Sequence, residues 1–440
     1  MDSSRAHPPD PSDPIVLTGI GCVLPGTPDV QTFWSHVSTG TSQVSRLEKP
    51  AFAAAGLPVH AAAQLGGFDT AARLPDLFPA HAAKYSRDIL ATMAAVRDAL
   101  ADAGIERGGI ERGGIERGGI APERLSIVQS SSRGPLSWWT ETITADPESN
   151  PYGGKATAMF RGLAGCPATL SAIDVGAKGL VTTISSACVG GHHAIGLALR
   201  ELRSGSADVV LAGGHEFPVV PEVARCYLAL GDGVLSPESD DPATAVRPYD
   251  RDRRGFALGE GAMTLCLERE SHARARGARI YARILGHRAL NEAHHATSMD
   301  LVGDVTASVV AGVLDDAGRK PEEIGYVCGH GTATRYNDIA ESRALRRLLP
   351  RHDDADLPPH GSNKPIYGHT FGMAGIINVA ATSLMLHHQR LAPTANHRTP
   401  DPECDYDHVA EGPRDAEFDL AVSLSFAFGS QTSVMALEHA

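Results

Sequence analysis

The chain has 440 residues, 42% of them hydrophobic and 21% charged, a composition that excludes a fibrous or wholly disordered protein and suits two domains or one large duplicated α/β unit. Its formal net charge of -13 at pH 7 disfavours nucleic acid and anionic membranes as partners, because an acidic surface repels phosphate. The seven cysteines have no paired spacing, which favours free thiols and a cytoplasmic location.

Residues 1–13 are polar and rich in proline, and they predict a disordered tail rather than a signal peptide. Short apolar runs that stop at glycine predict buried strands at 14–21, 209–214 and 324–329. Stretches typical of helices follow or separate these strands, at 89–103, 189–203, 306–317 and 375–388. This alternation of strands and helices predicts a layered α/β fold.

An internal duplication is indicated by LADAG at 100–104 and LDDAG at 314–318, each followed by Pro-Glu and a predicted strand. From glycine to proline there are 18 positions in the first copy and 3 in the second, and three GIERG pentapeptides at 104–118 account for the difference. We interpret the repeat as a surface-loop insertion, since glycine pairs disfavour a helix and added loop length costs little closure entropy. The chain is therefore predicted to form two related halves, at 14–270 and 271–440.

Cys188 stands between a predicted strand at 180–185 and the helix predicted at 189–203, so it should lie at a helix N-terminus. Unpaired N–H groups and the helix dipole favour a thiolate there, which predicts a lowered thiol pKa and a nucleophilic role. Gly190 and Gly191 leave room for a substrate. The alternative is a buried, inert cysteine, the usual state of a free cysteine.

Two histidines stand in settings that suit a functional site. His330 ends the strand predicted at 324–329 and begins HGTAT, and residues at the carboxyl ends of strands commonly face a site in layered α/β folds. His369 lies in KPIYGHTFGMAG, five residues after Lys364 and between glycines that permit close backbone approach. Taken singly, each histidine is more often structural.

Five motifs, SSACVGG, AGGHE, RPYDRDRRGFALGEGA, HGTAT and NKPIYGHTFGMAG, occur in the order and approximate spacing of β-ketoacyl synthases. The chain resembles the elongating, type II branch of that family from Pro14 to Glu438, and an ordered set of motifs is far more specific than any single one. The resemblance implies a thiolase-like fold, with two pseudo-duplicated halves in a five-layer α/β/α/β/α arrangement.

The resemblance also implies decarboxylative Claisen condensation in polyketide or fatty-acid type biosynthesis. Cys188 would accept an acyl group from phosphopantetheine on an acyl carrier protein, and malonyl-carrier protein would then extend it. His330 and His369 would stabilise the enolate formed as carbon dioxide leaves. The backbone N–H groups of Cys188 and Phe428 would stabilise the second oxyanion, and Lys364 would organise the histidines. No bound cofactor and no metal are expected.

Further roles follow from the same resemblance. Glu341 and Asp338 would join a polar network behind His330. Thr332 and Thr334 would hydrogen-bond the pantetheine arm, a suitable task for small hydroxyls. Capping of a helix is the alternative role for both threonines.

The chain departs from the family in a predicted gate loop within SLSFAFGSQTSVMAL. Phe426 and Phe428 are retained, but residues 427 and 430–432 differ from the common residues, and their Cβ atoms would restrict loop opening. Asn337 also replaces a usual glycine.

Arg133 in SSSRGPLSWW is a second departure, because the family lines its acyl pocket there with a small or apolar side chain. A buried guanidinium needs a partner. Arg133 would therefore shorten the pocket or pair with a polar or acidic acyl group, with Trp138 and Trp139 shaping the adjoining wall. The alternative is an Arg133 that turns outward, towards a dimer partner.

The expected partners are an acyl carrier protein and a second subunit, either an identical chain or a ketosynthase-like chain-length factor. Two other functions stay open. One is acyl transfer without decarboxylation, and the other is a chain-length-factor-like role that shapes a partner's tunnel. The retained Cys188 argues against the second.

Overall fold

A computed structural model of the chain describes residues 10, 12–106, 120–144, 156–349 and 357–440. Nearly all of the predicted tail and most of the GIERG repeat therefore lie outside the described residues. Ile105 and Ile120, on the two sides of the repeat's undescribed part, are buried in one apolar cluster. Among the described residues, no helix is long and apolar enough to cross a membrane.

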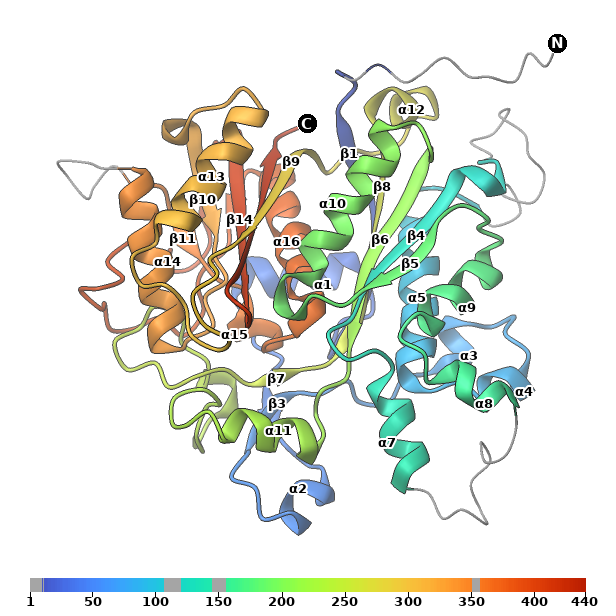
Figure 1. Cartoon of the computed structure of the whole chain (residues 1–440), viewed down its shortest axis with the longest axis horizontal. Coiled ribbons are helices and arrows are strands. Elements are labelled where there is room, and N and C mark those ends of the chain that lie inside the picture. The colour runs from blue at the N-terminus through green and yellow to red at the C-terminus, as the bar shows by residue number, and fades with distance from the viewer. Residues whose placement is uncertain (1–9, 11, 107–119, 145–155, 350–356) are drawn as a thin grey trace.

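Ten strands form one mixed sheet, five from each half of the chain, in the order β11-β10-β14-β15-β9-β1-β8-β6-β4-β5 (Figure 1). The first five along the chain are β1 (Ile15–Val23), β4 (Leu125–Ser130), β5 (Val181–Ile184), β6 (Val209–Glu216) and β8 (Gly261–Arg269). The other five are β9 (Ala282–Asn291), β10 (Ile324–Cys328), β11 (His360–Gly361), β14 (Leu420–Ala427) and β15 (Gln431–Glu438). The two groups join through β1 and β9, which pair over residues 15–17 and 282–284.

The two groups of strands share one topology, which confirms the predicted duplication. The five strands of each group can be numbered from first to fifth along the chain. From the junction outward, both groups then stand in the order first, fifth, fourth, second, third. The second strand pairs in parallel with the third and fourth in both groups, and the remaining pairs are antiparallel. The Pro-Glu pattern forms a 3-10 turn before the second strand each time, η2 (Pro122–Arg124) and η5 (Pro321–Glu323).

Helices form three layers around these strands (Figure 1). α10 (Gly190–Arg203) and α16 (Ala374–His388) contact each other and strands of both groups, so they form the middle layer. α5 (Arg87–Asp102) and α9 (Cys166–Val175) cover the N-terminal strands on the outside. α13 (Asp304–Asp316) covers the C-terminal strands, with α14 (Arg335–Leu348) beside it. With the two groups of strands as the two β layers, this is the predicted five-layer α/β/α/β/α arrangement.

The remaining elements surround this framework. They are α1 (Val30–Thr39), β2 (Ser45–Arg46), α2 (Pro50–Ala54), β3 (Ala61–Ala63), α3 (Thr70–Arg73), α4 (Pro79–Ala82), α7 (Leu136–Thr144), α8 (Ala156–Arg161), α11 (Pro221–Leu228), β7 (Leu258–Gly259), α12 (Glu270–Ala275), α15 (Lys364–Tyr367), β12 (Arg390–Leu391) and β13 (Arg414–Asp415). The predicted division between residues 270 and 271 falls at the start of α12.

Glycines bring the starts of the two middle helices together. A Cβ atom on Gly191 would come within 2.8 Å of the Ile376 backbone nitrogen, and one on Gly375 would come within 2.8 Å of the His192 nitrogen. Both distances are shorter than real Cβ contacts, so larger residues would push the helices apart. The close crossing places the segment before α10, which holds Cys188, beside the segment before α16, which holds His369.

A buried carboxylate on α5 predicts a pH effect on stability. Asp88 accepts hydrogen bonds from the backbone and hydroxyl of Ser137, but burial still raises its pKa to about 7. Between pH 4 and pH 7 the folded chain therefore holds a proton that the unfolded chain has released. The contribution of Asp88 to the free energy of unfolding falls across that window, by at most about 1.4 kcal/mol per pH unit, and is flat above it.

Asp88→Asn should remove this dependence. The free energy of unfolding of the variant, measured by urea denaturation, is expected to increase relative to that of the wild type as pH rises from 5 to 7. Above pH 7 the difference between the two proteins should stay constant. Parallel curves for the two proteins would show that Asp88 is ionised in the folded state throughout.

Candidate active site

Cys188 lies in the 3-10 turn η3 (Ala187–Val189), which leads directly into α10, so the predicted position at a helix start is confirmed. Ala187 before it has φ 44°, in the left-handed region that favours glycine. Phe371, two residues after His369, has φ 41°. Such strained positions persist where the surrounding structure enforces them, and they concentrate at functional sites.

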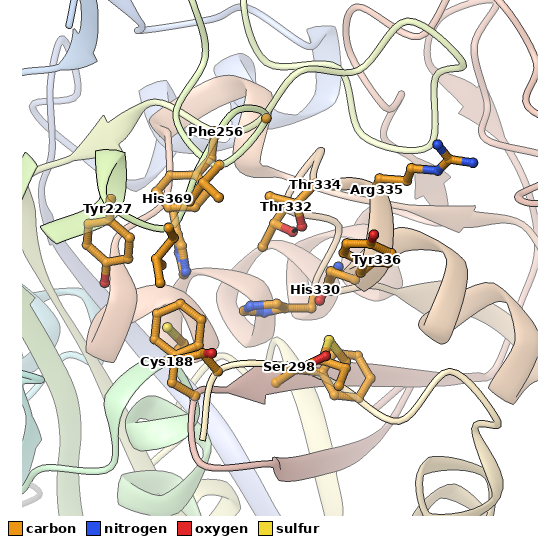
Figure 2. A pocket seen from close by; sticks show the side chains of 18 of the residues that line it. Cys188, Tyr227, Phe256, Ser298, His330, Thr332, Thr334, Arg335, Tyr336 and His369 are labelled. Carbon is orange, nitrogen blue, oxygen red and sulfur yellow. Dashed lines mark hydrogen bonds between the residues drawn. The ribbon is translucent and has the colours of Figure 1, made fainter. Parts of the chain in front are cut away.

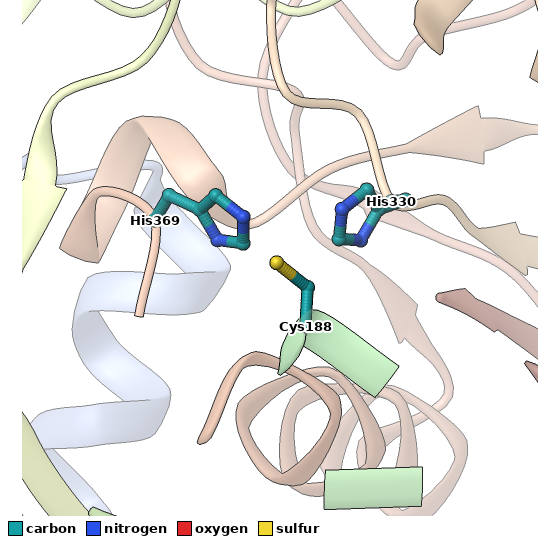
Figure 3. A group of neighbouring side chains, drawn as sticks. All are labelled: Cys188, His330 and His369. Carbon is teal, nitrogen blue, oxygen red and sulfur yellow. The ribbon is translucent and has the colours of Figure 1, made fainter. Parts of the chain in front are cut away.

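The structure brings together the three predicted catalytic side chains. His330 follows β10, and His369 precedes the 3-10 turn η7 (Phe371–Met373) that leads into α16. The Cys188 sulfur and ring nitrogens of both histidines all lie within 4.8 Å of one another, and all three residues are buried. Figure 3 shows the sulfur pointing between the two rings. One cysteine and two histidines also match ligands that zinc accepts, so the expected absence of a metal stays a prediction.

The surroundings of the two imidazoles fix their protonation. Burial, followed by the charge of Lys364, holds the pKa of His330 and His369 well below its ordinary value, so both rings are neutral. The Phe371 N–H donates to Nδ1 of His369 at 3.3 Å. The Lys364 ammonium lies 3.4 Å from Nδ1 of His330 and has only donors to offer. Both Nδ1 atoms are therefore acceptors, and each ring presents an Nε2–H donor.

Lys364 and Glu341 hold the His330 turn from behind. Nζ of Lys364 donates to the His330 carbonyl. The Glu341 carboxylate accepts from the backbone N–H groups of His330 at 2.6 Å and Gly331 at 3.0 Å. Burial lowers the pKa of Lys364 to about 8, against the opposing effect of Glu341, so the side chain is a cation at neutral pH. The predicted organising contacts of Lys364 and Glu341 are therefore present.

The network extends further than the sequence indicated. Asp338 accepts from the Tyr249 N–H at 2.8 Å and from the Asn337 amide at 3.0 Å. It also pairs with Arg253, whose Nε lies 3.5 Å from its carboxylate. Asn337 reaches Glu341 at 3.3 Å as well, so the residue that replaces a family glycine links the two carboxylates. Tyr249 and Arg253 lie within the quoted RPYDRDRRG motif, which was the available signal for them.

The predicted lowering of the Cys188 thiol pKa is wrong. Burial raises this pKa to about 12, although the positive charges of Lys364 and Arg133 act to lower it. Cys188 packs in one buried cluster with Tyr227, Phe256 and Phe371, and loss of hydration penalises the thiolate more than the nearby positive charges favour it. The resting nucleophile is therefore a neutral thiol.

A cavity of about 380 Å³ opens onto the three side chains. In Figure 2 Cys188, His330 and His369 lie at one end, and Arg335 and Tyr336 lie at the other. Thr332 and Thr334 line the cavity between them, with their hydroxyls 2.7 Å apart. Thr334 occupies the N-cap position of α14 but its side chain makes no capping hydrogen bond, so the helix-cap alternative is wrong for Thr334.

The predicted gate residues lie at the tip of the β14–β15 hairpin. Phe426 is buried, with its ring 5.9 Å from that of His330, and Phe428 lines the cavity with 41% of its surface exposed. The unusual residues tie the hairpin to the end of β9 and the segment after it. The Ser430 hydroxyl donates to the His295 carbonyl at 2.6 Å, and Thr432 donates to Glu292 at 3.3 Å. These contacts agree with the predicted restriction of the loop.

Arg133 points into the protein, next to the site, so the alternative of an outward-turned Arg133 is wrong. Its guanidinium lies over the Phe371 ring at 4.8 Å and donates to the Tyr227 hydroxyl at 2.8 Å. Trp138 and Trp139 instead pack over Gly162, and neither lines the described cavity. Their assignment to the acyl-pocket wall stays a prediction.

Tyr227 and Glu216 were missed by the sequence reasoning. Tyr227 lines the cavity and stacks on Phe371 with 5.2 Å between ring centroids, and no motif marks it. Glu216 ends β6 within the AGGHE motif, and its buried carboxylate accepts from the backbone N–H groups of Ser132 and Gly372. It thereby joins the Arg133 loop to the His369 loop.

Comparisons with known proteins agree with this geometry. The family model described as "Beta-ketoacyl synthase, N-terminal domain" matches residues 12–273, and "Beta-ketoacyl synthase, C-terminal domain" matches residues 281–398. The tetracenomycin polyketide synthase ketoacyl synthase alpha subunit of Streptomyces glaucescens is 32% identical over 433 residues, which cover 96% of each protein.

Two solved structures share the fold across the whole chain. One is a type II polyketide synthase acyl-carrier protein in complex with its ketosynthase bound to the hexaketide, with a TM-score of 0.85, 27% identity and coverage of 97% of this chain and 99% of that one. The ishigamide ketosynthase/chain length factor matches with a TM-score of 0.85, 27% identity, and the same coverage of 97% and 99%.

Proposed function

Because the chain belongs to the β-ketoacyl synthase family, we propose that Cys188, His330 and His369 are the residues that perform its condensation reaction. The chain is an acyltransferase-type ketosynthase of polyketide or fatty-acid type biosynthesis. The observation that carries the proposal is the meeting of one thiol and two neutral imidazoles, within 4.8 Å of one another, where a cavity opens onto them.

The first step would transfer an acyl group to Cys188. The sulfur forms a bond to the acyl carbon, the bond from that carbon to the pantetheine sulfur breaks, and the thiol proton goes to the departing sulfur. The covalent acyl enzyme divides one difficult transfer into two easier steps. The positive charges of Lys364 and Arg133 favour the anionic character that the sulfur develops during attack.

The second step would form the carbon nucleophile. As the malonyl carboxylate leaves as carbon dioxide, its bonding electrons form an enolate, whose oxygen accepts from the Nε2–H donors of His330 and His369. Preorganised donors stabilise such charge without reorganisation. The enolate carbon attacks the acyl-Cys188 carbonyl. Collapse of that intermediate, held by the predicted N–H donors of Cys188 and Phe428, breaks the carbon–sulfur bond and expels the Cys188 thiolate, which takes up a proton from solvent to return to the thiol.

The substrates are proposed to arrive on the phosphopantetheine of an acyl carrier protein. The cavity supports this, because its lining includes both the catalytic side chains and the exposed Arg335 and Tyr336 (Figure 2). The hydroxyls of Thr332 and Thr334 would donate hydrogen bonds to the amide carbonyls of the arm or accept them from its amide N–H groups. One similar structure is a complex of a ketosynthase with its acyl-carrier protein. The cytoplasmic location stays a prediction.

The second subunit is proposed to dock at the free edge of β5, the last strand of the sheet order. Within the described chain, large apolar side chains near this edge are exposed on α8, on the segment between α8 and α9, on α9 and just before β5. They are Met159, Phe160, Leu163, Ile173 and Leu180. Exposed apolar groups beside an unpaired strand edge suit a stable protein interface. An identical chain and a chain-length factor both remain candidates, and light scattering of the protein alone distinguishes them.

The proposed function is tested by supplying malonyl-carrier and acyl-carrier thioesters, then measuring carbon dioxide release and the mass of the carrier-bound product. Extension by a two-carbon keto unit supports condensation. Acylation of Cys188 without extension would point to simple acyl transfer, and absence of acylation would favour the chain-length-factor role.

A further inference from the structure

Arg133 lies beside the nucleophile in a setting of aromatic rings and hydroxyls. Its guanidinium carbon lies 4.8 Å from the centre of the Phe371 ring and 5.7 Å from that of Tyr227. Nη2 donates to the Tyr227 hydroxyl and Nη1 to the Ser132 hydroxyl, both at 2.8 Å. These contacts hold the planar group in one orientation, but they occupy only two of its five N–H donors.

No carboxylate among the described residues lies within ion-pair distance of Arg133. The charge of the Glu216 carboxylate acts on the Arg133 guanidinium, but the Oε1 atom of Glu216 already accepts from the backbone N–H groups of Ser132 and Gly372. A partly buried guanidinium without a directly bonded anion is uncommon, because such groups are normally paired. The remaining donors are therefore suited to a ligand.

The position of the guanidinium relates it to the acyl group rather than to the pantetheine arm. Tyr227 and Phe371 line the cavity together with Cys188, and the three belong to one packed cluster. Arg133 stacks on the side of these two rings, and the Ser132 carbonyl accepts from the Ser185 hydroxyl in the segment that leads to Cys188. Arg133 itself is not among the residues that line the described cavity, but its charge acts on both Cys188 and His369. An acyl chain on Cys188 that extends between the rings of Tyr227 and Phe371 would therefore reach the guanidinium.

We propose that Arg133 makes the enzyme select acyl groups that carry an oxygen acceptor close to the thioester, a 3-oxo group or a terminal carboxylate, over unsubstituted alkyl chains. This inference rests on the proposed function of Cys188. An alkyl chain would cover the free donors of the guanidinium without replacing their hydrogen bonds to water, which is costly. A carbonyl or carboxylate oxygen replaces those bonds. Sites built around polar donors discriminate strongly against analogues that lack the matching group.

The test measures acylation of Cys188 by intact-protein mass, with pantetheine thioesters as donors so that carrier recognition plays no part. Acetoacetyl is compared with butyryl, and succinyl with pentanoyl, which separates a 3-oxo group from a carboxylate. Arg133→Met keeps a long side chain without donors. The preference for the oxygenated member of at least one pair is expected to be about tenfold or more greater in the wild type than in Arg133→Met, and butyryl loading should rise in the variant.

Tyr227→Phe removes the hydroxyl that holds the guanidinium and should weaken the preference by a smaller factor, which keeps the test informative if Arg133→Met is unstable. Arg390→Met, at an exposed ion pair with Asp415, is the matched control and should retain the wild-type ratios. Equal ratios in the wild type, Arg133→Met and Tyr227→Phe would overturn the role of Arg133 alone. Failure of every thioester to acylate Cys188 would overturn the proposed function with it.

Discussion

Cys188→Ala is expected to abolish formation of the acyl enzyme and to lower the rate of condensation by about 10⁴-fold or more, the scale seen when a covalent nucleophile is removed. No other group in the His330–His369 cluster can form the thioester intermediate. Decarboxylation of malonyl-carrier should continue in the variant, because both Nε2–H donors remain. Intact-protein mass and carbon dioxide release measure the two steps separately.

Cys226→Ala is the matched control, since Cys226 is an exposed free thiol. It should retain the wild-type rate of condensation and the mass shift of the acyl enzyme. A Cys188→Ala protein that still gains the acyl mass, or a Cys226→Ala protein that loses it, would contradict the assignment of the nucleophile.

Lys364→Met is expected to lower carbon dioxide release by about 10²-fold, the size of effect found when one preorganised electrostatic group is lost. The variant lacks the ammonium that contacts Nδ1 and the carbonyl of His330, so the ring loses both its orientation and the bias that keeps its proton on Nε2. Acylation of Cys188 should fall by a smaller factor, because the thiol itself remains.

The pH dependence separates this organising role from a purely structural one. With a pKa of about 8, Lys364 is a cation at pH 7 and loses its proton as the pH rises through 8. Carbon dioxide release by the wild type should therefore decline above pH 8, and Lys364→Met should lack that decline. Lys178→Met, at an exposed lysine, should retain the wild-type profile. Identical profiles in the wild type and Lys364→Met would show that the charge has no part in decarboxylation.

Several elements could be predicted because their signals are local. Apolar runs that end at glycine marked β1, β6 and β10, and helical periodicity marked α5, α10, α13 and α16, each to within about two residues, the usual difference between assignments. The repeated Asp-Ala-Gly and Pro-Glu pattern predicted the duplication, since both copies form a helix, a 3-10 turn and a strand. The extent of the shared topology only became visible in the pairing of the strands.

The thiol pKa shows where local reasoning was insufficient. A helix start does favour a thiolate, and Cys188 does lie at one. The burial of that helix start depends on Tyr227, Phe256 and Phe371, which lie in the same packed cluster as Cys188 but come from three separate segments of the chain. No spacing in the sequence relates these residues, so the larger opposing effect could not be foreseen.

The sequence by itself determined the fold class, the family and the three candidate catalytic residues, because strand and helix patterns are local and the motifs stand in a fixed order along the chain. Only the tertiary structure decided that Arg133 faces Tyr227 and Phe371, that Asn337 links two buried carboxylates, and that the resting thiol is neutral. Each of these depends on distances between segments that are far apart in sequence and on their shared exclusion of water, and both are properties of the packed chain.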